Sequence, residues 1–200
     1  MQDYRQSAVN AIYLFMVQGM NYLVPLFLMF HLIKYLGVSG FGEYAFWYSV
    51  LLYVQAIVEY GFSFSGTREV ATANNDSGRL SNIFFQVTVA KLLMAFVVLF
   101  VALFCLILNI VPITAIFAVL AGIALALIPN WYFQGLQKLR GITILGVALR
   151  VVFIISVYIL IDGSSTVKQV LFLQLLSLLP LLFVGNYLAC RQLCRPREMR

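Results

Sequence analysis

Two cations, Lys91 and Arg150, have the clearest chemical meaning in this chain, because both lie inside long apolar stretches. Lys91 lies nine residues into the stretch 82–108, and Arg150 lies nine residues into the stretch 141–161. A helix rises about 1.5 Å per residue, so two membrane helices that start on one side would place both charges about 13 Å deep. A charge at that depth costs at least about 2.5–3.5 kcal/mol on insertion scales. We therefore expect both cations to face a cavity that accepts an anion. Helix–helix hydrogen bonds, or side chains that extend to the cytoplasmic surface, are the alternatives.

Glu59 lies near the end of a second apolar stretch, 41–63. Gln55 precedes it by one helical turn and therefore shares its face. We also expect Gln55 to line the substrate cavity. Arg68 follows after several small residues that allow a helix to bend or end. Two interpretations remain open: Glu59 and Arg68 form a gate or ion-coupling pair, or they form a plain ion pair that closes the helix end.

The first apolar stretch, 8–33, carries a polar stripe at helical spacing. We expect Gln18 and Asn21 of this stripe to face the cavity, although such stripes also hold neighbouring membrane helices together. Pro25 lacks an N–H group and invites a kink in the same helix.

The sequence predicts no enzyme, no metal site and no cofactor. His31 is the single histidine, the carboxylates are scattered, and no serine has the surroundings of a nucleophile. Cys190 and Cys194 lie one turn apart, but no histidine or carboxylate beside them would complete a metal site. Nucleic acid is also a poor partner for so apolar a chain.

The elements that must position these residues are membrane helices. Hydrophobic residues make up 63% of the chain, charged residues 10%, and the mean hydropathy is +0.98. A soluble domain averages about 25% charged residues, so lipid must be the solvent here. Helices satisfy every backbone polar group internally, which predicts an all-α bundle. We expect six transmembrane helices followed by a basic tail at 191–200, with the spans at 8–33, 41–63, 82–108, 110–132, 141–161 and 168–190.

The basic residues outside the spans predict the orientation. Nine lie on the side that holds both termini, and two lie on the other side. Because basic loops stay in the cytoplasm, both termini are expected inside. The first group is Arg5, Arg68, Arg79, Lys138, Arg140, Arg191, Arg195, Arg197 and Arg200, and the second is Lys34 and Lys168. Aromatic residues near the span ends, Tyr44, Trp47, Tyr48, Trp131 and Tyr132, are expected in interfacial belts.

Several strings, in this order and spacing, make the chain resemble the Wzx-type polysaccharide flippases of the MOP superfamily, which also includes the MATE exporters. They are G-F-G-E-Y at 40–44, E-Y-G-F at 59–62, T-R-E-V-A at 67–71 and P-N-W-Y-F-Q-G at 129–135. The last string supplies the family-motif residues Trp131, Phe133, Gln134 and Gly135.

The resemblance implies a multi-pass protein of the bacterial inner membrane. Such proteins move polyprenyl-diphosphate-linked oligosaccharides to the outer leaflet for O-antigen or capsule synthesis. Two six-helix lobes give alternating access to a cationic cavity.

Two departures from the family pattern affect what the resemblance implies. Gln137 stands where the family usually has a carboxylate, so no role of that carboxylate is carried over. The chain also has only about half the family's length, so it resembles the first lobe alone. We expect it to form a homodimer or to pair with a second six-helix lobe. A truncated or non-transporting fragment and a MATE-like small-molecule exporter are the alternatives.

Overall fold

The computed structural model describes residues 2–73 and 76–194, apart from the side chains at 2–11, 14, 16–18, 21 and 194. The described chain is all α, as the sequence predicts. Its helical segments are α1 (Gln2–Glu59), α2 (Phe62–Thr72), α3 (Ser77–Ile107), α4 (Ile113–Leu127), α5 (Asn130–Gly135), α6 (Arg140–Leu160) and α7 (Val167–Cys194).

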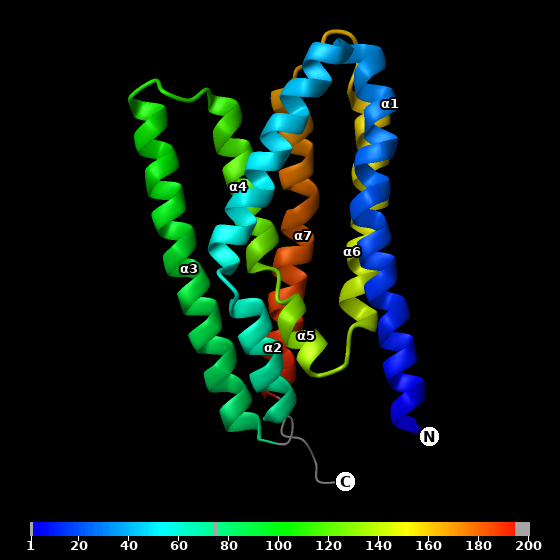
Figure 1. The fold of residues 1–200 in the computed structure, drawn as a ribbon, viewed down its shortest axis with the longest axis vertical. Coiled ribbons are helices and arrows are strands. Elements are labelled where there is room, and N and C mark those ends of the chain that lie inside the picture. Colours follow the sequence, from blue (N-terminus) through cyan, green and yellow to red (C-terminus); the bar gives the residue numbers. More distant parts are fainter. Residues whose placement is uncertain (1, 74–75, 195–200) are drawn as a thin grey trace.

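The long helices stand side by side, and α2 and α5 lie together at one end of the bundle (Figure 1). The chain rises through the first half of α1 and descends through the second half. It then rises through α3 and α6 and descends through α4 and α7 (Figure 1). The first residues of α1 and the last residues of α7 consequently lie at the same end.

Within the described residues, five helical segments are long and apolar enough to cross a membrane. They are Tyr22–Glu59, Ser77–Ile107, Ile113–Gly135, Arg140–Leu160 and Val167–Leu193. The protein is therefore a helical membrane protein. The first and second predicted spans share one helical segment, because α1 stays helical through Pro25 and departs from helical geometry only at Gly37.

Gly37 makes the fold of α1 possible. Its backbone angles are φ 75° and ψ 176°, a region that only glycine adopts readily. The kink in α1 lies at this residue, and Figure 1 shows that the chain reverses its direction within α1. A single non-helical residue thus replaces the loop that the sequence places between residues 33 and 41.

We expect Gly37→Ala to destabilise the protein by about 1–3 kcal/mol, because a Cβ atom is strained at this φ and ψ. Gly42→Ala is the matched control. It lies in the same helix, its φ is not positive, and a Cβ there would meet no atom within 4 Å. Alanine favours a helix over glycine, so the control should be neutral or slightly stabilising. Unfolding in detergent measures both variants, and equal stability of the two would contradict the strain argument.

The structure corrects two other boundaries. The segment 64–81, which the predicted spans leave as a connection between two membrane helices, contains most of α2 and the start of α3. The stretch 110–132 is not one helix, because it breaks at Ile128 and Pro129 between α4 and α5. Proline removes a backbone donor, so the helix ends before it.

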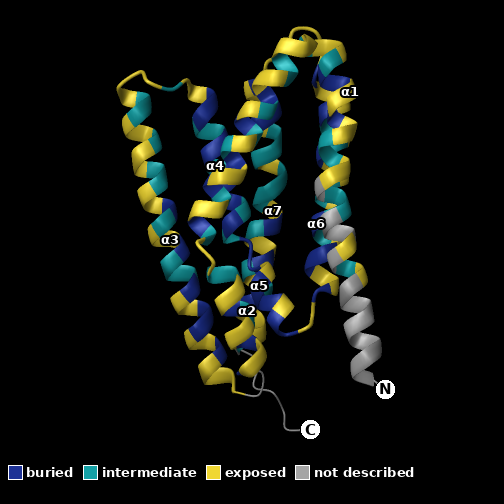
Figure 2. Ribbon diagram, viewed as in Figure 1, coloured by how far each residue is buried: buried dark blue, intermediate teal, exposed yellow. Residues whose placement is uncertain are grey.

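Burial identifies α4 as the central helix. In the most apolar 18-residue window of Ile113–Gly135, 61% of the residues are buried, whereas the corresponding share in α3 is only 11%. Helix α3 exposes large apolar residues along much of its length (Figure 2). Gly122 explains how α4 packs so closely on α1. A Cβ atom there would lie 2.6 Å from the Leu51 carbonyl oxygen. The small Gly122 and Ala126 therefore pack tightly against neighbouring elements, as their four-residue spacing indicates.

The prediction that five aromatic residues form interfacial belts is wrong for four of them. Tyr44, Trp47, Trp131 and Tyr132 are buried inside the protein, and Tyr48 is half-buried. Phe84 of α3 packs against both Trp131 and Tyr132, with ring centroids 5.9 and 5.3 Å away. These rings form a core that holds α5 against α3, because aromatic side chains bury a large apolar area.

His31 joins α1 to the end of α6. Its ring lies against Tyr35 and Tyr158, with centroids 4.7 and 4.2 Å away. Its Nε2 donates to the Ile161 carbonyl 3.2 Å away, since a carbonyl can only accept. His31 is therefore a buried contact between two helices.

Candidate functional site

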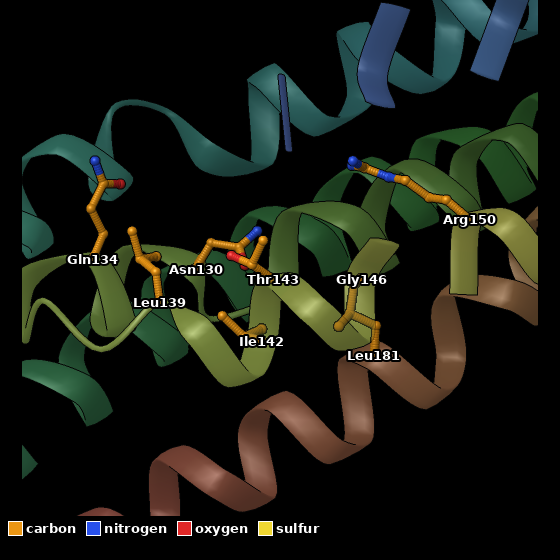
Figure 3. A pocket seen from close by; sticks show the side chains of 8 residues that line it. All are labelled: Asn130, Gln134, Leu139, Ile142, Thr143, Gly146, Arg150 and Leu181. Atoms are coloured by element: carbon orange, nitrogen blue, oxygen red, sulfur yellow. The ribbon is translucent and has the colours of Figure 1, made fainter. Parts of the chain in front are cut away.

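A pocket of about 200 Å³ lies between α5, α6 and α7 (Figure 3). Its polar lining residues are Asn130, Gln134, Thr143 and Arg150, and its apolar ones are Leu139, Ile142, Gly146 and Leu181. None of the eight is a carboxylate. The pocket thus combines a mostly apolar wall with a few convergent polar groups, which is typical of ligand sites.

The break between α4 and α5 positions one end of the pocket. Because the helix stops at Leu127 and restarts at Asn130, α5 takes its own place beside α6. Asn130 and Gln134 are one turn apart on α5, and both are exposed. Both side chains line the pocket, with Asn130 beside Thr143 and Gln134 at one end (Figure 3).

Helix α6 contributes half of the lining residues of the pocket, including the positively charged Arg150. Thr143, Gly146 and Arg150 recur at three- and four-residue spacing, so they share one face of the helix. Thr143 is buried, whereas Arg150 is only half-buried. The Arg150 side chain reaches back along the pocket toward Thr143 and Asn130 (Figure 3). Arg150 interacts electrostatically with Tyr48 of α1. The second half of α1 therefore lies close to the pocket.

These groups suit a small anion. A guanidinium offers five N–H donors in a planar fork that matches phosphate, and the amides and the hydroxyl can add hydrogen bonds. Drug-sized ligands need about 300–1,000 Å³, so a pocket of about 200 Å³ suits a phosphate-sized group better than a sugar chain.

The structure does not place Lys91 in this pocket. Lys91 is buried, and its ammonium donates to the Ser63 hydroxyl, 3.2 Å away, and to the Ala126 carbonyl, 3.0 Å away. It extends between α2, α3 and α4, whereas the Arg150 pocket is lined by α5, α6, α7 and the turn between α5 and α6. The two cations therefore have different surroundings.

Glu59 and its proposed partners are only partly brought together. Gln55 Nε2 lies 3.5 Å from the Glu59 carboxylate, as their spacing predicts. Arg68 is exposed on α2, and the described residues show no ion pair between it and Glu59. The carboxylate instead attracts Lys91 electrostatically. The side chains of Gln18 and Asn21 lie outside the described residues.

Sequence reasoning missed Asn130 and Thr143 as lining residues. Asn130 could have been found, because Pro129 interrupts the apolar stretch and Asn130 is the polar residue directly after it. Thr143 carries no comparable signal, since a threonine among apolar residues also occurs as ordinary helix packing. In the described residues, no three histidine, cysteine or acidic side chains gather where they could hold a metal ion.

The family model for polysaccharide biosynthesis proteins matches residues 7–199, which is nearly the whole chain. The chain belongs to this family. Two curated relatives, from Escherichia coli strain K12 and Shigella dysenteriae, carry the name "Putative O-antigen transporter". Each is 29% identical to this chain over 170 residues.

The matched region covers 82% of this chain but only 41% of the E. coli relative and 42% of the Shigella relative. The family member described here thus spans about two fifths of the length of the curated relatives it matches. No solved structure gives a significant match to the chain.

Within this member of the family, the W-Y-F-Q-G string is mainly a packing element. Thr67 of α2 donates its hydroxyl to the Trp131 carbonyl, 3.2 Å away. A Cβ atom on Gly66 would lie 2.7 Å from the Trp131 ring, and one on Gly135 would lie 2.8 Å from the Thr67 carbonyl oxygen. The glycines let α2 and α5 touch. Of the residues Trp131, Phe133, Gln134 and Gly135, only Gln134 lines the pocket.

Proposed function

We propose that this protein takes part in moving a polyprenyl-diphosphate-linked oligosaccharide across the bacterial inner membrane for the synthesis of a surface polysaccharide. The observation that carries the proposal is a half-buried arginine in a carboxylate-free pocket of a membrane protein from a polysaccharide biosynthesis family. The names of the two relatives support an O-antigen precursor as the cargo.

In this proposal the pocket holds the diphosphate rather than the sugars. The Arg150 guanidinium would bind phosphate oxygens through its fork, and Asn130 and Thr143 would donate further hydrogen bonds. The half-buried setting strengthens these bonds, because electrostatic interactions weaken in bulk water. Transport would then be an alternating-access movement around the bound headgroup, without covalent chemistry.

The same proposal gives the protein six membrane crossings with both termini in the cytoplasm. The segment Tyr22–Glu59 has 38 residues, or about 57 Å of helix, which is nearly twice the thickness of a hydrocarbon core. Because this helix bends at Gly37, we infer that each half crosses once. The basic residues at the end that holds Arg79 and Arg140 then place that end inside.

A cation exporter is less well supported by the same pocket. A positively charged cargo would need acidic side chains, and none of the eight lining residues is acidic. The anionic lipid headgroup is therefore the better match for this site.

Deletion of the gene from the bacterium that carries it tests the function. We expect surface polysaccharide to fall and lipid-linked oligosaccharide to accumulate on the cytoplasmic leaflet, while total synthesis of the lipid-linked precursor continues. Re-expression should restore the surface polymer. Continued synthesis separates a translocation defect from a biosynthetic one. Unchanged surface polymer in the deletion strain would contradict the proposal.

A further inference from the structure

The Lys91 ammonium lies where two interruptions of the helices meet. The side chain is 2% exposed and comes from the middle of α3. One of its hydrogen-bond acceptors, Ser63, lies in the first turn of α2, directly after the break at Tyr60 and Gly61, both of which have positive φ. The other acceptor, Ala126, lies in the last turn of α4, directly before the break at Pro129. One side chain therefore connects both breaks.

The Ala126 carbonyl needs this donor because of the break itself. In a continuous helix it would accept from the N–H group of Asn130. Here that N–H donates to the Ile128 carbonyl instead, 2.9 Å away. The next carbonyl, that of Leu127, is also held by a side chain, because Asn186 Nδ2 lies 3.3 Å from it. Lys91 and Asn186 thus replace backbone donors that α4 has lost.

The charge of Lys91 matches its position. Carbonyl groups at the C-terminal end of a helix carry partial negative charge, which favours a cation there. Glu59, the last residue of α1, adds a full negative charge that attracts the same ammonium. Broken membrane helices can coordinate a free cation with carbonyls of this kind. In this chain the cation is tethered to α3.

The geometry points to Lys91 as a positioning residue whose ammonium fixes the break between α4 and α5 and thereby the Asn130 and Gln134 wall of the Arg150 pocket. Asn130 follows Ala126 by four residues, with only the break between them. The inference rests on the proposed function only in treating that pocket as the cargo site. Its test uses purified protein and no cargo, so its failure is distinguishable from a failure of the proposed function.

The first experiment compares the thermal midpoints of purified variants in detergent. Lys91→Met keeps the length and removes the charge, Lys91→Ala leaves a space, and Ser63→Ala removes one acceptor. Lys138→Met is the control, because Lys138 is exposed. We expect both Lys91 variants to lower the midpoint by about 5 °C or more, Ser63→Ala to lower it less, and the control to leave it unchanged. A midpoint for Lys91→Met equal to that of the control would overturn the inference.

A soluble amine tests whether a tethered cation is what the site requires. Ethylammonium has N–H donors and is small enough to replace the lost end of the side chain, whereas tetramethylammonium has the same charge and no N–H group. We expect ethylammonium to restore most of the midpoint of Lys91→Ala. It should not restore Lys91→Met, whose side chain fills the space. Equal effects of the two salts on Lys91→Ala would overturn the hydrogen-bonding role.

A local measurement separates positioning from general stability. A single cysteine at Asn130, in a chain whose native cysteines are replaced by serine, reports the exposure of the pocket wall. Below the midpoint of every variant, we expect Lys91→Ala to raise its labelling rate severalfold and ethylammonium to reverse the change. A lower midpoint with an unchanged labelling rate would show that Lys91 does not position α5.

Discussion

Replacing Arg150 with alanine should reduce surface polysaccharide to the level of the deletion strain, while the protein still inserts and accumulates. The guanidinium supplies two charge-assisted hydrogen bonds to a diphosphate, and each is worth about 1.5–3 kcal/mol. Losing both would weaken cargo binding by roughly 100- to 10,000-fold. The hydroxyl of Thr143 and the amide of Asn130 are neutral and could not replace them.

The Arg150→Lys variant separates the effect of the donor's shape from the effect of its charge. An ammonium keeps the charge but lacks the planar fork, so we expect export between that of the wild type and that of Arg150→Ala. Arg140→Ala is the control, since Arg140 is exposed at the start of the same helix and does not line the pocket. Surface polysaccharide and inner-membrane protein are measured together. Normal export by Arg150→Ala would mean that the pocket does not hold the charged headgroup.

The second large effect concerns a proposed second lobe. The chain spans about two fifths of the length of its curated relatives. A charged pocket open to hydrocarbon costs several kcal/mol, and a second lobe would remove that cost. We therefore propose that the functional form is a homodimer or a complex with a second six-helix lobe, with the cavity at the interface.

Mass measurement in nanodiscs and cysteine crosslinking test this proposal. In a chain without native cysteines, Gln55→Cys and Gln134→Cys should crosslink to a second copy or to a co-expressed second lobe. Phe100→Cys is the control, because Phe100 is exposed on the little-buried helix α3, which does not line the pocket. A well-folded monomer that restores export alone, with no crosslinks at either position, would sink the proposal and place the whole cavity within one lobe.

The Lys91 and Arg150 assignments have different consequences for export. Arg150 lines the pocket, so its loss should act on cargo binding. Lys91 contacts Ser63 and Ala126, so its loss should act on stability and on the position of α5. Measuring variants of both residues in one strain would separate the two effects, which the sequence alone had joined in one cavity.

The sequence by itself determined the membrane character, the all-α class and the family. Apolar stretches of membrane length leave the backbone no alternative to helices, and the strings around 40–71 and 129–135 are local features that remain readable without a structure. The sequence also showed that Lys91 and Arg150 carry a high free-energy cost of insertion into the membrane. The rise per residue gives the depth of each charge along its helix.

Only the tertiary structure decided what these residues contact. The rise per residue says nothing about the direction in which a side chain leaves the bundle axis, so equal depth did not bring Lys91 and Arg150 together. The donor that Ala126 lacks became visible only once Pro129 was seen to divide α4 from α5. The aromatic residues near that break turned inward because α5, a six-residue helix, is held by packing against α2 and α3 rather than by its own hydrogen bonds.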